Sequence, residues 1–219
     1  MKKAFIFDFD GTIGETIPLV LSAIESAYTD MGLTAPSRDA IQANFGPNEI
    51  GLCKRLFPDS LKDAETLYKR YLFHYEAKHE EYSPSPFANI AEVLKILSEN
   101  AIPIAIVTGK GDDTAKISLQ KYGVGNLFSA IECGSEIGVV KPEKIKKVLD
   151  VWNTSPSETK VYYVGDAVSD VYDAIEGGIT PVSCAWSTLA DVSELKKTPT
   201  TKIFESVEDF KNWILTEII

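Results

Sequence analysis

The chain has 219 residues, of which 44% are hydrophobic and 25% are charged, and its formal net charge is −10. This length suits one well-buried domain with a smaller accessory domain, and the composition excludes a disordered or collagen-like chain. The acidic balance argues against a nucleic-acid partner because phosphate backbones favour basic surfaces, and no apolar stretch approaches the ~18 residues of a membrane span.

The first predicted element is a short strand over residues 4–7, which runs directly into the sequence DFDGT. All of its residues are apolar, as in a parallel strand that is buried on both faces. Asp8 and Asp10 follow it at once. Because an unpaired carboxylate at the end of a core strand loses its hydration at a high cost, the rest of the chain must supply partners for this pair.

Residues 17–82 have a helical pattern throughout, with glycines and prolines at the turns. The sequence SPSP at residues 83–86 indicates a stiff, extended linker after them. Since this block separates the first strand from the strands that follow, we expect an inserted helical cap domain over residues 16–83. The catalytic core then consists of residues 1–15 and 84–219.

Strands and helices alternate from residue 88 to the end of the chain, which predicts a doubly wound parallel α/β sheet of the Rossmann-like kind. One of the helices is expected to be capped by Asp112 or Asp113. The predicted strands cover residues 102–109, 129–133, 160–166, 180–186 and 202–206, and the predicted helices cover residues 88–100, 112–123, 142–152, 169–178 and 207–218.

Polar side chains follow several of these apolar strands. In an open parallel sheet, ligands bind outside the carboxyl ends of the strands, so these side chains are expected to converge on one site. Lys110 and Gly111 lie among them but lack the GxxxxGK spacing of a phosphate-binding loop. The converging residues are Asp8, Asp10, Thr108, Gly109, Lys141, Asp166 and Asp170.

Four aspartates that lie close together repel one another unless a cation lies among them. Oxygen ligands without histidine or cysteine favour Mg²⁺, which binds carboxylates together with a substrate phosphate. Lys141 adds a second positive charge. A nucleophilic carboxylate, a divalent cation, a lysine and a hydroxyl group suit phosphoryl transfer through an aspartyl-phosphate, with Asp10 as the acid–base group beside Asp8.

Four motifs of the chain resemble those of the haloacid dehalogenase superfamily, both in their order and in their placement after strands. They are DFDGT at residues 8–12, VTG at 107–109, KP at 141–142 and GDAVSD at 165–170. The helical insert between the first two motifs is similar to the first cap type, found in phosphoglycolate phosphatase-like and β-phosphoglucomutase-like proteins. The resemblance covers essentially the whole chain.

This resemblance implies a role for each residue of the motifs. Asp8 would be the nucleophile, and Asp10 would first protonate the leaving group and then activate water. Mg²⁺ would be bound by the Asp8 carboxylate, the Asp10 backbone carbonyl and Asp166. Asp170 would lie in or near the layer of groups that surrounds these ligands. The transferred phosphoryl group would be bound by Asp8, Thr108, Gly109 and Lys141.

The cap is expected to select the substrate through a Gly–Pro turn that leans over the active site. A lid of this kind excludes water and macromolecules, which favours a small soluble phosphate ester. His74 and His79 are five residues apart, so they do not share a helix face as metal ligands would, and both are expected on the surface of the cap. The candidates for substrate contact are Asn44, Asn48, Lys54 and Arg55.

The predicted function is that of a cytoplasmic, Mg²⁺-dependent phosphatase, a monomer or homodimer, that acts on a small phosphorylated metabolite such as a phosphoglycolate-like ester or a sugar or nucleotide phosphate. No membrane or nucleic-acid partner is expected, and three cysteines without CxxC spacing fit a reducing compartment and small buried side chains. Three alternatives remain. They are a sugar phosphomutase, which Thr12 disfavours, a phosphonoacetaldehyde hydrolase with Lys54 as its Schiff-base lysine, and a non-enzymatic binding protein that retains the fold.

Overall fold

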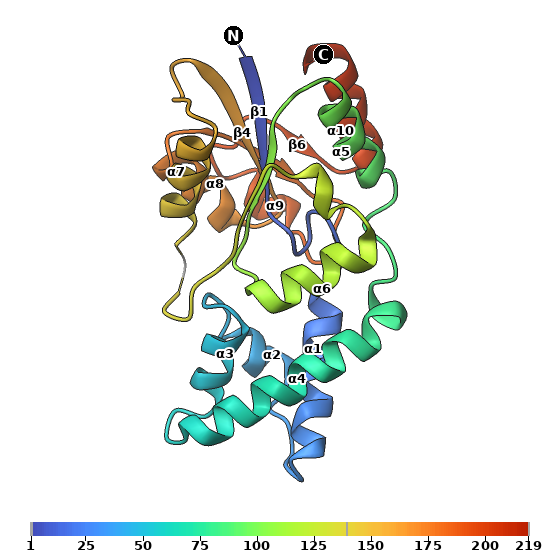
Figure 1. Cartoon of the computed structure of the whole chain (residues 1–219), viewed down its shortest axis with the longest axis vertical. Coiled ribbons are helices and arrows are strands. Elements are labelled where there is room, and N and C mark those ends of the chain that lie inside the picture. The colour runs from blue at the N-terminus through green and yellow to red at the C-terminus, as the bar shows by residue number, and fades with distance from the viewer. Residues whose placement is uncertain (1, 139, 219) are drawn as a thin grey trace.

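A six-stranded parallel sheet lies at the centre of the larger part of the computed structural model, which describes residues 2–138 and 140–218 (Figure 1). The strand order is β3-β2-β1-β4-β5-β6, so the first strand of the chain lies inside the sheet between β2 and β4. The prediction of a doubly wound parallel α/β fold is confirmed. The strands are β1 (Lys2–Phe7), β2 (Ile104–Val107), β3 (Ala130–Glu132), β4 (Thr159–Gly165), β5 (Thr180–Cys184) and β6 (Ile203–Phe204).

The last four residues of β1, AFIF at positions 4–7, are all apolar and buried because helices cover both faces of the sheet. Phe5 and Phe7 belong to the apolar core on one face, and Ala4 and Ile6 belong to the core on the other. Since side chains alternate along a strand, one apolar run serves both cores. The first face is covered by α5 (Ile90–Glu99), α6 (Asp112–Tyr122) and α10 (Val207–Trp213). The second face is covered by α7 (Lys141–Val151) and α8 (Val168–Glu176). Three short elements complete the fold, namely η1 (Gly125–Leu127), α9 (Val192–Leu195) and the π-helical turn η2 (Ile214–Ile218).

Four further helices form a separate layer beside the carboxyl edge of the sheet (Figure 1). This helical layer has an apolar core of its own, in which α1 packs along α4 and the rings of Tyr71 and Tyr75 are fully buried. The prediction of a helical pattern over residues 17–82 is therefore confirmed. The helices are α1 (Ile17–Asp30), α2 (Arg38–Gln42), α3 (Glu49–Leu56) and α4 (Leu61–Tyr82).

The chain enters and leaves the helical layer at neighbouring points. The backbone N–H of Phe87, on the way back to the sheet, donates to the carbonyl of Ile13 at 2.9 Å. Ser83, at the end of α4, has its hydroxyl 2.5 Å from the hydroxyl of Tyr122 in α6. These contacts hold the two connections next to each other at the edge of the sheet.

The expectation that both histidines lie on the surface is wrong for His79. The residues Tyr71, Tyr75 and His79 recur every four positions and so lie along one buried face of α4. The last turn of that helix packs on α6, where the His79 ring lies 2.9 Å from the hydroxyl of Ser118. His74 is on another face of the helix, and its ring nitrogen lies 2.8 Å from a carboxylate oxygen of Asp30.

The remaining expectations concern the cysteines and the membrane. Cys53, Cys133 and Cys184 are all buried and free, as predicted. Within residues 2–138 and 140–218, no helix is both long and apolar enough to cross a bilayer. Met1, Val139 and Ile219, which the sequence assigns to the core domain, lie outside the described residues.

Candidate active site

The loops after three adjacent strands meet at one edge of the sheet. Asp8 follows β1, Thr108 follows β2, and Asp166 follows β4. Because the strand order places β1 between the other two, their carboxyl ends lie side by side. Lys141 reaches the same edge as the first residue of α7.

Lys141 bridges two of these carboxylates. Its Nζ atom lies 2.8 Å from Oδ2 of Asp8 and 2.5 Å from Oδ1 of Asp170. Asp170 also accepts the backbone N–H of Ala167 at 3.0 Å, which fixes its carboxylate at the start of α8. All three charged side chains are buried, and the Lys141 ammonium lies over the ring of Tyr163. The sequence-predicted lysine and aspartates are thus brought into direct contact.

Asp166 completes a cluster of three carboxylates. Asp8, Asp166 and Asp170 each offer one oxygen, and these atoms all lie within 4.8 Å of one another. Burial raises the pKa of Asp8 to about 6 against the opposing effect of Lys141, and burial together with Asp170 and Asp8 raises the pKa of Asp166 to about 8. Such carboxylates favour a bound cation among them, and an all-oxygen donor set fits Mg²⁺.

Gly11 makes room for this cluster. Its backbone has a φ of +75°, and a Cβ atom at this position would collide with the carboxylate of Asp166. Only glycine accepts both constraints without strain. The glycine of the DFDGT sequence therefore allows the loop after β1 to pass close to the loop after β4.

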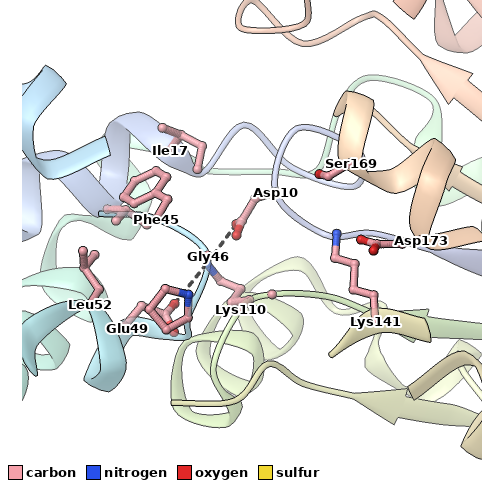
Figure 2. Close-up of a pocket in the computed structure, with 13 residues that line it drawn as sticks. Asp10, Ile17, Phe45, Gly46, Glu49, Leu52, Lys110, Lys141, Ser169 and Asp173 are labelled. Carbon is pink, nitrogen blue, oxygen red and sulfur yellow. Dashed lines mark hydrogen bonds and ion pairs between the residues drawn. The ribbon is translucent and has the colours of Figure 1, made fainter. Parts of the chain in front are cut away.

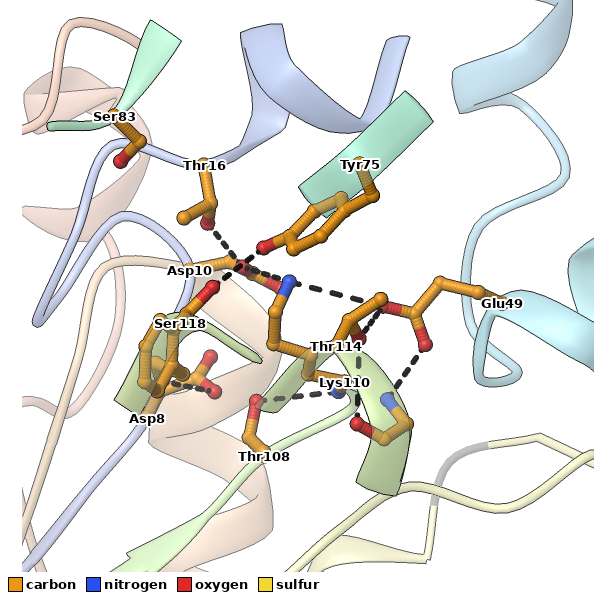
Figure 3. Close-up of polar contacts among 12 residues, drawn as sticks. Asp8, Asp10, Thr16, Glu49, Tyr75, Ser83, Thr108, Lys110, Thr114 and Ser118 are labelled. Carbon is orange, nitrogen blue, oxygen red and sulfur yellow. Dashed lines mark hydrogen bonds and ion pairs between the residues drawn. The ribbon is translucent and has the colours of Figure 1, made fainter. Parts of the chain in front are cut away.

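The carboxylate of Asp10 points toward Thr16 and Lys110 (Figure 3). It accepts hydrogen bonds from the Thr16 hydroxyl and from Nζ of Lys110, the latter at 2.9 Å. The Lys110 side chain has no exposed surface, and its ammonium lies 4.9 Å from the ring centre of Tyr75. Burial alone would lower the pKa of Lys110. The negative charges of Asp10 and Glu49 and the contact with Tyr75 outweigh this effect, so that the pKa lies well above its ordinary value.

Lys110 is a residue of the site that the sequence reasoning missed. The comparison made for it was with a phosphate-binding loop, which it does not match. The available signal was its position two residues after Thr108, in a loop between a fully buried strand and a helix. Its backbone N–H donates to the Thr108 hydroxyl at 3.2 Å, so the same loop also orients that buried threonine.

Glu49 of α3 is a second such residue, and it joins the helical layer to the sheet (Figure 3). One carboxylate oxygen accepts the backbone N–H of Gly111 at 2.6 Å, and the other accepts the Thr114 hydroxyl and lies 3.7 Å from Nζ of Lys110. Glu49 thereby satisfies the first turn of α6 from outside that helix. Nothing in its local sequence distinguishes it from a surface glutamate.

The prediction that Asp112 or Asp113 caps α6 is therefore wrong. The residue at the cap position is Gly111, and no side chain of the helix makes a capping hydrogen bond. Both aspartates lie inside the first turn, where they are exposed and where acidic residues suit the positive end of the helix. Glu49 instead accepts the N–H of the cap residue Gly111 and the hydroxyl of Thr114 at this end of the helix.

A cavity of about 180 Å³ lies between the sheet edge and the helical layer (Figure 2). Gly109, Lys110, Lys141 and Asp10 line it on the side of the sheet, together with residues from α8. Figure 2 shows the Asp10 carboxylate between the ammonium of Lys141 and the apolar side chains of the helical layer. The other lining residues are Ile17, Val20, Phe45, Gly46, Pro47, Glu49, Leu52, Ser169 and Asp173.

The four polar cap residues predicted to contact the substrate do not line this cavity. Asn48 caps α3 by accepting the Gly51 N–H, and Lys54 pairs with Glu136. Arg55 donates to the carbonyls of Asn44 and Phe45, and the Asn44 amide donates to the carbonyl of Ala40. Their polar groups are used within the cap or toward the loop at 134–136, and the neighbouring residues Phe45, Gly46, Pro47, Glu49 and Leu52 reach the cavity instead.

Comparison with known proteins places this geometry in context. The model of the haloacid dehalogenase-like hydrolase family matches residues 5–183. A phosphoglycolate phosphatase of Agrobacterium fabrum is 27% identical over 81% of this chain and 78% of its own length, and the pyrophosphatase PpaX of Halalkalibacterium halodurans is 28% identical over 80% and 79%. A solved structure from Haemophilus somnus, described as a predicted phosphoglycolate phosphatase, superposes with a TM-score of 0.78 at 20% identity, over 96% of this chain and 97% of that one.

Proposed function

We propose that this chain, which belongs to the haloacid dehalogenase-like hydrolase family, is a Mg²⁺-dependent phosphatase that hydrolyses a small phosphomonoester through an aspartyl-phosphate. The family resemblance read from the four motifs is confirmed by the family match, and the chain's curated relatives are named as phosphatases. The proposed substrate is a small phosphorylated metabolite, such as a phosphoglycolate-like, sugar or nucleotide ester. The arrangement of the carboxylates supports the metal ion and the aspartyl-phosphate.

The observation that carries the proposal is the contact of Lys141 with both Asp8 and Asp170, in a cluster where Asp166 supplies a third carboxylate. A lysine and a divalent cation together would neutralise the charge of a phosphoryl group placed against Asp8. Bound by Asp8, Asp166, Asp170 and the backbone of Asp10, Mg²⁺ would supply this charge neutralisation and orient the phosphate oxygens.

The chain's own residues then perform two displacements. A carboxylate oxygen of Asp8 attacks phosphorus, the bond to the leaving oxygen breaks, and Asp10 gives that oxygen its proton. Asp10, now ionised, takes a proton from water, which attacks phosphorus and releases phosphate from Asp8. Lys141, Thr108 and Gly109 bind the phosphoryl oxygens through both steps.

Residues 16–83 are proposed as the cap domain that closes over residues 1–15 and 84–219. The separate apolar core of the helical layer and the adjacent connections at Ile13 and Phe87 support this division. Burial of the cavity between the two parts would keep bulk water from the aspartyl-phosphate and would exclude macromolecules.

Measuring phosphate release from a broad panel of phosphate esters and pyrophosphate, with Mg²⁺ and with EDTA, tests the function. Wild-type protein should turn over one chemical class in a metal-dependent manner, and Asp8→Asn should reduce turnover by at least ~10³-fold because it removes the nucleophile. Asp150→Asn, an exposed aspartate of α7, is the matched control and should retain activity. Full activity of Asp8→Asn would rule out the mechanism.

Two of the alternatives differ from the phosphatase in what they require. Interconversion of sugar phosphate isomers in the presence of a bisphosphate would indicate a phosphomutase. A phosphonoacetaldehyde hydrolase needs a lysine facing the substrate, whereas Lys54 is paired with Glu136 and does not line the cavity. No observation favours that alternative.

A further inference from the structure

The cavity is mainly apolar on the side of the helical layer. Ile17 and Val20 of α1, Leu52 of α3, and Phe45 and Pro47 from the loop before α3 line it there. Figure 2 shows Ile17, Phe45 and Leu52 grouped around this end. Its volume of about 180 Å³ is below the ~300–1,000 Å³ typical of sites for drug-sized ligands. An ester that fits therefore has a small leaving group, which is in contact with hydrocarbon.

Both lysines that line the cavity already have anionic partners. Lys110 lies 2.9 Å from Asp10 and 3.7 Å from Glu49, and its side chain has no exposed surface. Lys141 lies against Asp8 and Asp170 and faces the phosphoryl site. Among the described lining residues, no cation remains to pair with a second anionic group of a substrate.

The acidic side chains that line the cavity also disfavour a second anionic group on the substrate. Among the described residues, Glu49 is the one charged side chain that the helical layer contributes to the cavity, and both of its oxygens already accept hydrogen bonds. Asp173 of α8 also lines the cavity, and its Oδ2 atom is buried without a hydrogen-bond partner among the described residues. A carboxylate or second phosphate on the leaving group would thus meet like charges and an apolar wall.

We propose that the cavity selects phosphomonoesters of small, uncharged alcohols and discriminates against esters that carry a second anionic group. This inference rests on the proposed phosphatase function and narrows its substrate class. Glu49 and Leu52 are the specificity-determining residues, because one places a negative charge and the other a hydrocarbon surface where the leaving group lies. Phosphoglycolate and pyrophosphate, which relatives are named for, are on this basis poor substrates.

The test compares two esters of nearly equal size, 2-phosphoglycolate and its neutral amide, carbamoylmethyl phosphate. Their kcat/KM values are measured with wild-type protein and Mg²⁺. The amide should be preferred by at least ~10-fold, since discrimination by one buried charged group is of this order or larger. Equal values, or a preference for phosphoglycolate, would overturn the inference while leaving the phosphatase function intact.

Two variants examine the proposed determinants. Leu52→Lys places a cation in the cavity and should shift the ratio of the two kcat/KM values toward phosphoglycolate by ~10-fold, whereas the similar-sized Leu52→Met should not shift it. Glu49→Gln removes the negative charge with little change of shape and should shift the ratio in the same direction. This variant provides the test if Leu52→Lys fails to fold. An unchanged ratio in folded Leu52→Lys or Glu49→Gln protein would contradict the assignment.

Binding measurements keep the inference separate from catalysis. Calorimetric titration of each ester into Asp8→Asn protein with Mg²⁺ should show tighter binding of the amide, because the cavity is unchanged in that variant. Tighter or equal binding of phosphoglycolate would overturn the selectivity. If the wild-type protein binds the amide selectively but hydrolyses no ester, the proposed function fails and the selectivity of the cavity stands.

Discussion

The ammonium of Lys110 lies 2.9 Å from a carboxylate oxygen of Asp10, and the same lysine lies 3.7 Å from Glu49 of the helical layer. One buried cation therefore links the proposed acid–base residue to the proposed lid (Figure 3). Because the Lys110 side chain has no exposed surface and the carboxylates of Asp10 and Glu49 are mostly buried, removal of the lysine leaves two poorly solvated negative charges close together. This arrangement yields the first prediction.

Lys110→Met is expected to lower the free energy of unfolding by about 3 kcal/mol, since it leaves Asp10 and Glu49 without their shared cation. Phosphatase activity should fall in the same variant because Asp10 loses the contact that orients it. Urea unfolding and steady-state kinetics measure the two effects. The control is Lys116→Met on the exposed face of α6, for which the change should stay within about 0.5 kcal/mol. Equal stability of the two variants would refute the pairing.

Gly111→Ala is expected to loosen the contact between the helical layer and α6. The backbone of Gly111 is extended, so alanine is sterically acceptable there, but its Cβ would lie 2.6 Å from the Glu49 carboxylate. Displacing Glu49 should cost about 1–3 kcal/mol of stability and raise KM. Gly125→Ala, whose Cβ would meet Leu119 at an ordinary 3.5 Å, is the control for the loss of a glycine. A harmless Gly111→Ala would show that Glu49 does not hold the lid.

His79 should make the protein sensitive to mild acid. Burial, together with Lys110 and Lys121, lowers the pKa of His79 to about 4 from an ordinary value of 6.5. Because the folded state favours the neutral ring, the stability that His79 contributes is present above pH 6.5 and is lost as the pH falls toward 4. The tyrosines packed on the ring, Tyr75 and Tyr122, stay neutral in this range.

Thermal unfolding from pH 7 to pH 4.5 measures this effect, with His79→Gln as the comparison. The variant should lose less stability over this range than the wild-type protein, because both share every carboxylate and differ in the histidine alone. Parallel pH profiles of the two proteins would show that His79 does not titrate at the expected pH.

Mg²⁺ should raise the unfolding temperature of the wild-type protein, and EDTA should reverse the change, because an ion that binds only the folded state stabilises it. Asp166→Asn should abolish the effect by removing one of three clustered carboxylates. The exposed Asp112→Asn is the control and should respond to Mg²⁺ like the wild-type protein. A full response of Asp166→Asn would place the ion elsewhere.

The fold and the aspartate cluster could be predicted because each strand and the polar residues after it are visible in a short stretch of sequence. An apolar run that ends in Asp8 and Asp10 can be read directly, and the geometry of parallel strands then brings the ends of β1, β2 and β4 together. Lys141 and Asp170 are found by the same reasoning, as polar residues at the start of the helices that follow β3 and β4.

The contacts of the helical layer could not be predicted in this way. Glu49 caps a helix that is more than sixty positions away in the chain, and its role depends on how α3 sits against α6. Sequence shows that α3 is a helix and does not show where it docks. For the same reason the prediction selected Asn48 and Arg55, whose polar atoms bond to backbone groups, rather than Phe45 and Leu52, which line the cavity. His79 was detectable, since its four-residue spacing from Tyr75 marks a shared face.

The interior position of β1 has a consequence for how the chain matures. This strand is made first, yet the strands that flank it begin only at Ile104 and Thr159. The helical layer lies in the sequence between β1 and β2 and has a core of its own. Because its residues contact partners closer in the chain than the partners of β1, it can fold earlier than the sheet. We therefore expect the proposed lid to form on the ribosome before the site that it covers. The proposed metal site cannot be complete in a nascent chain until β4 has emerged and Asp166 can join Asp8.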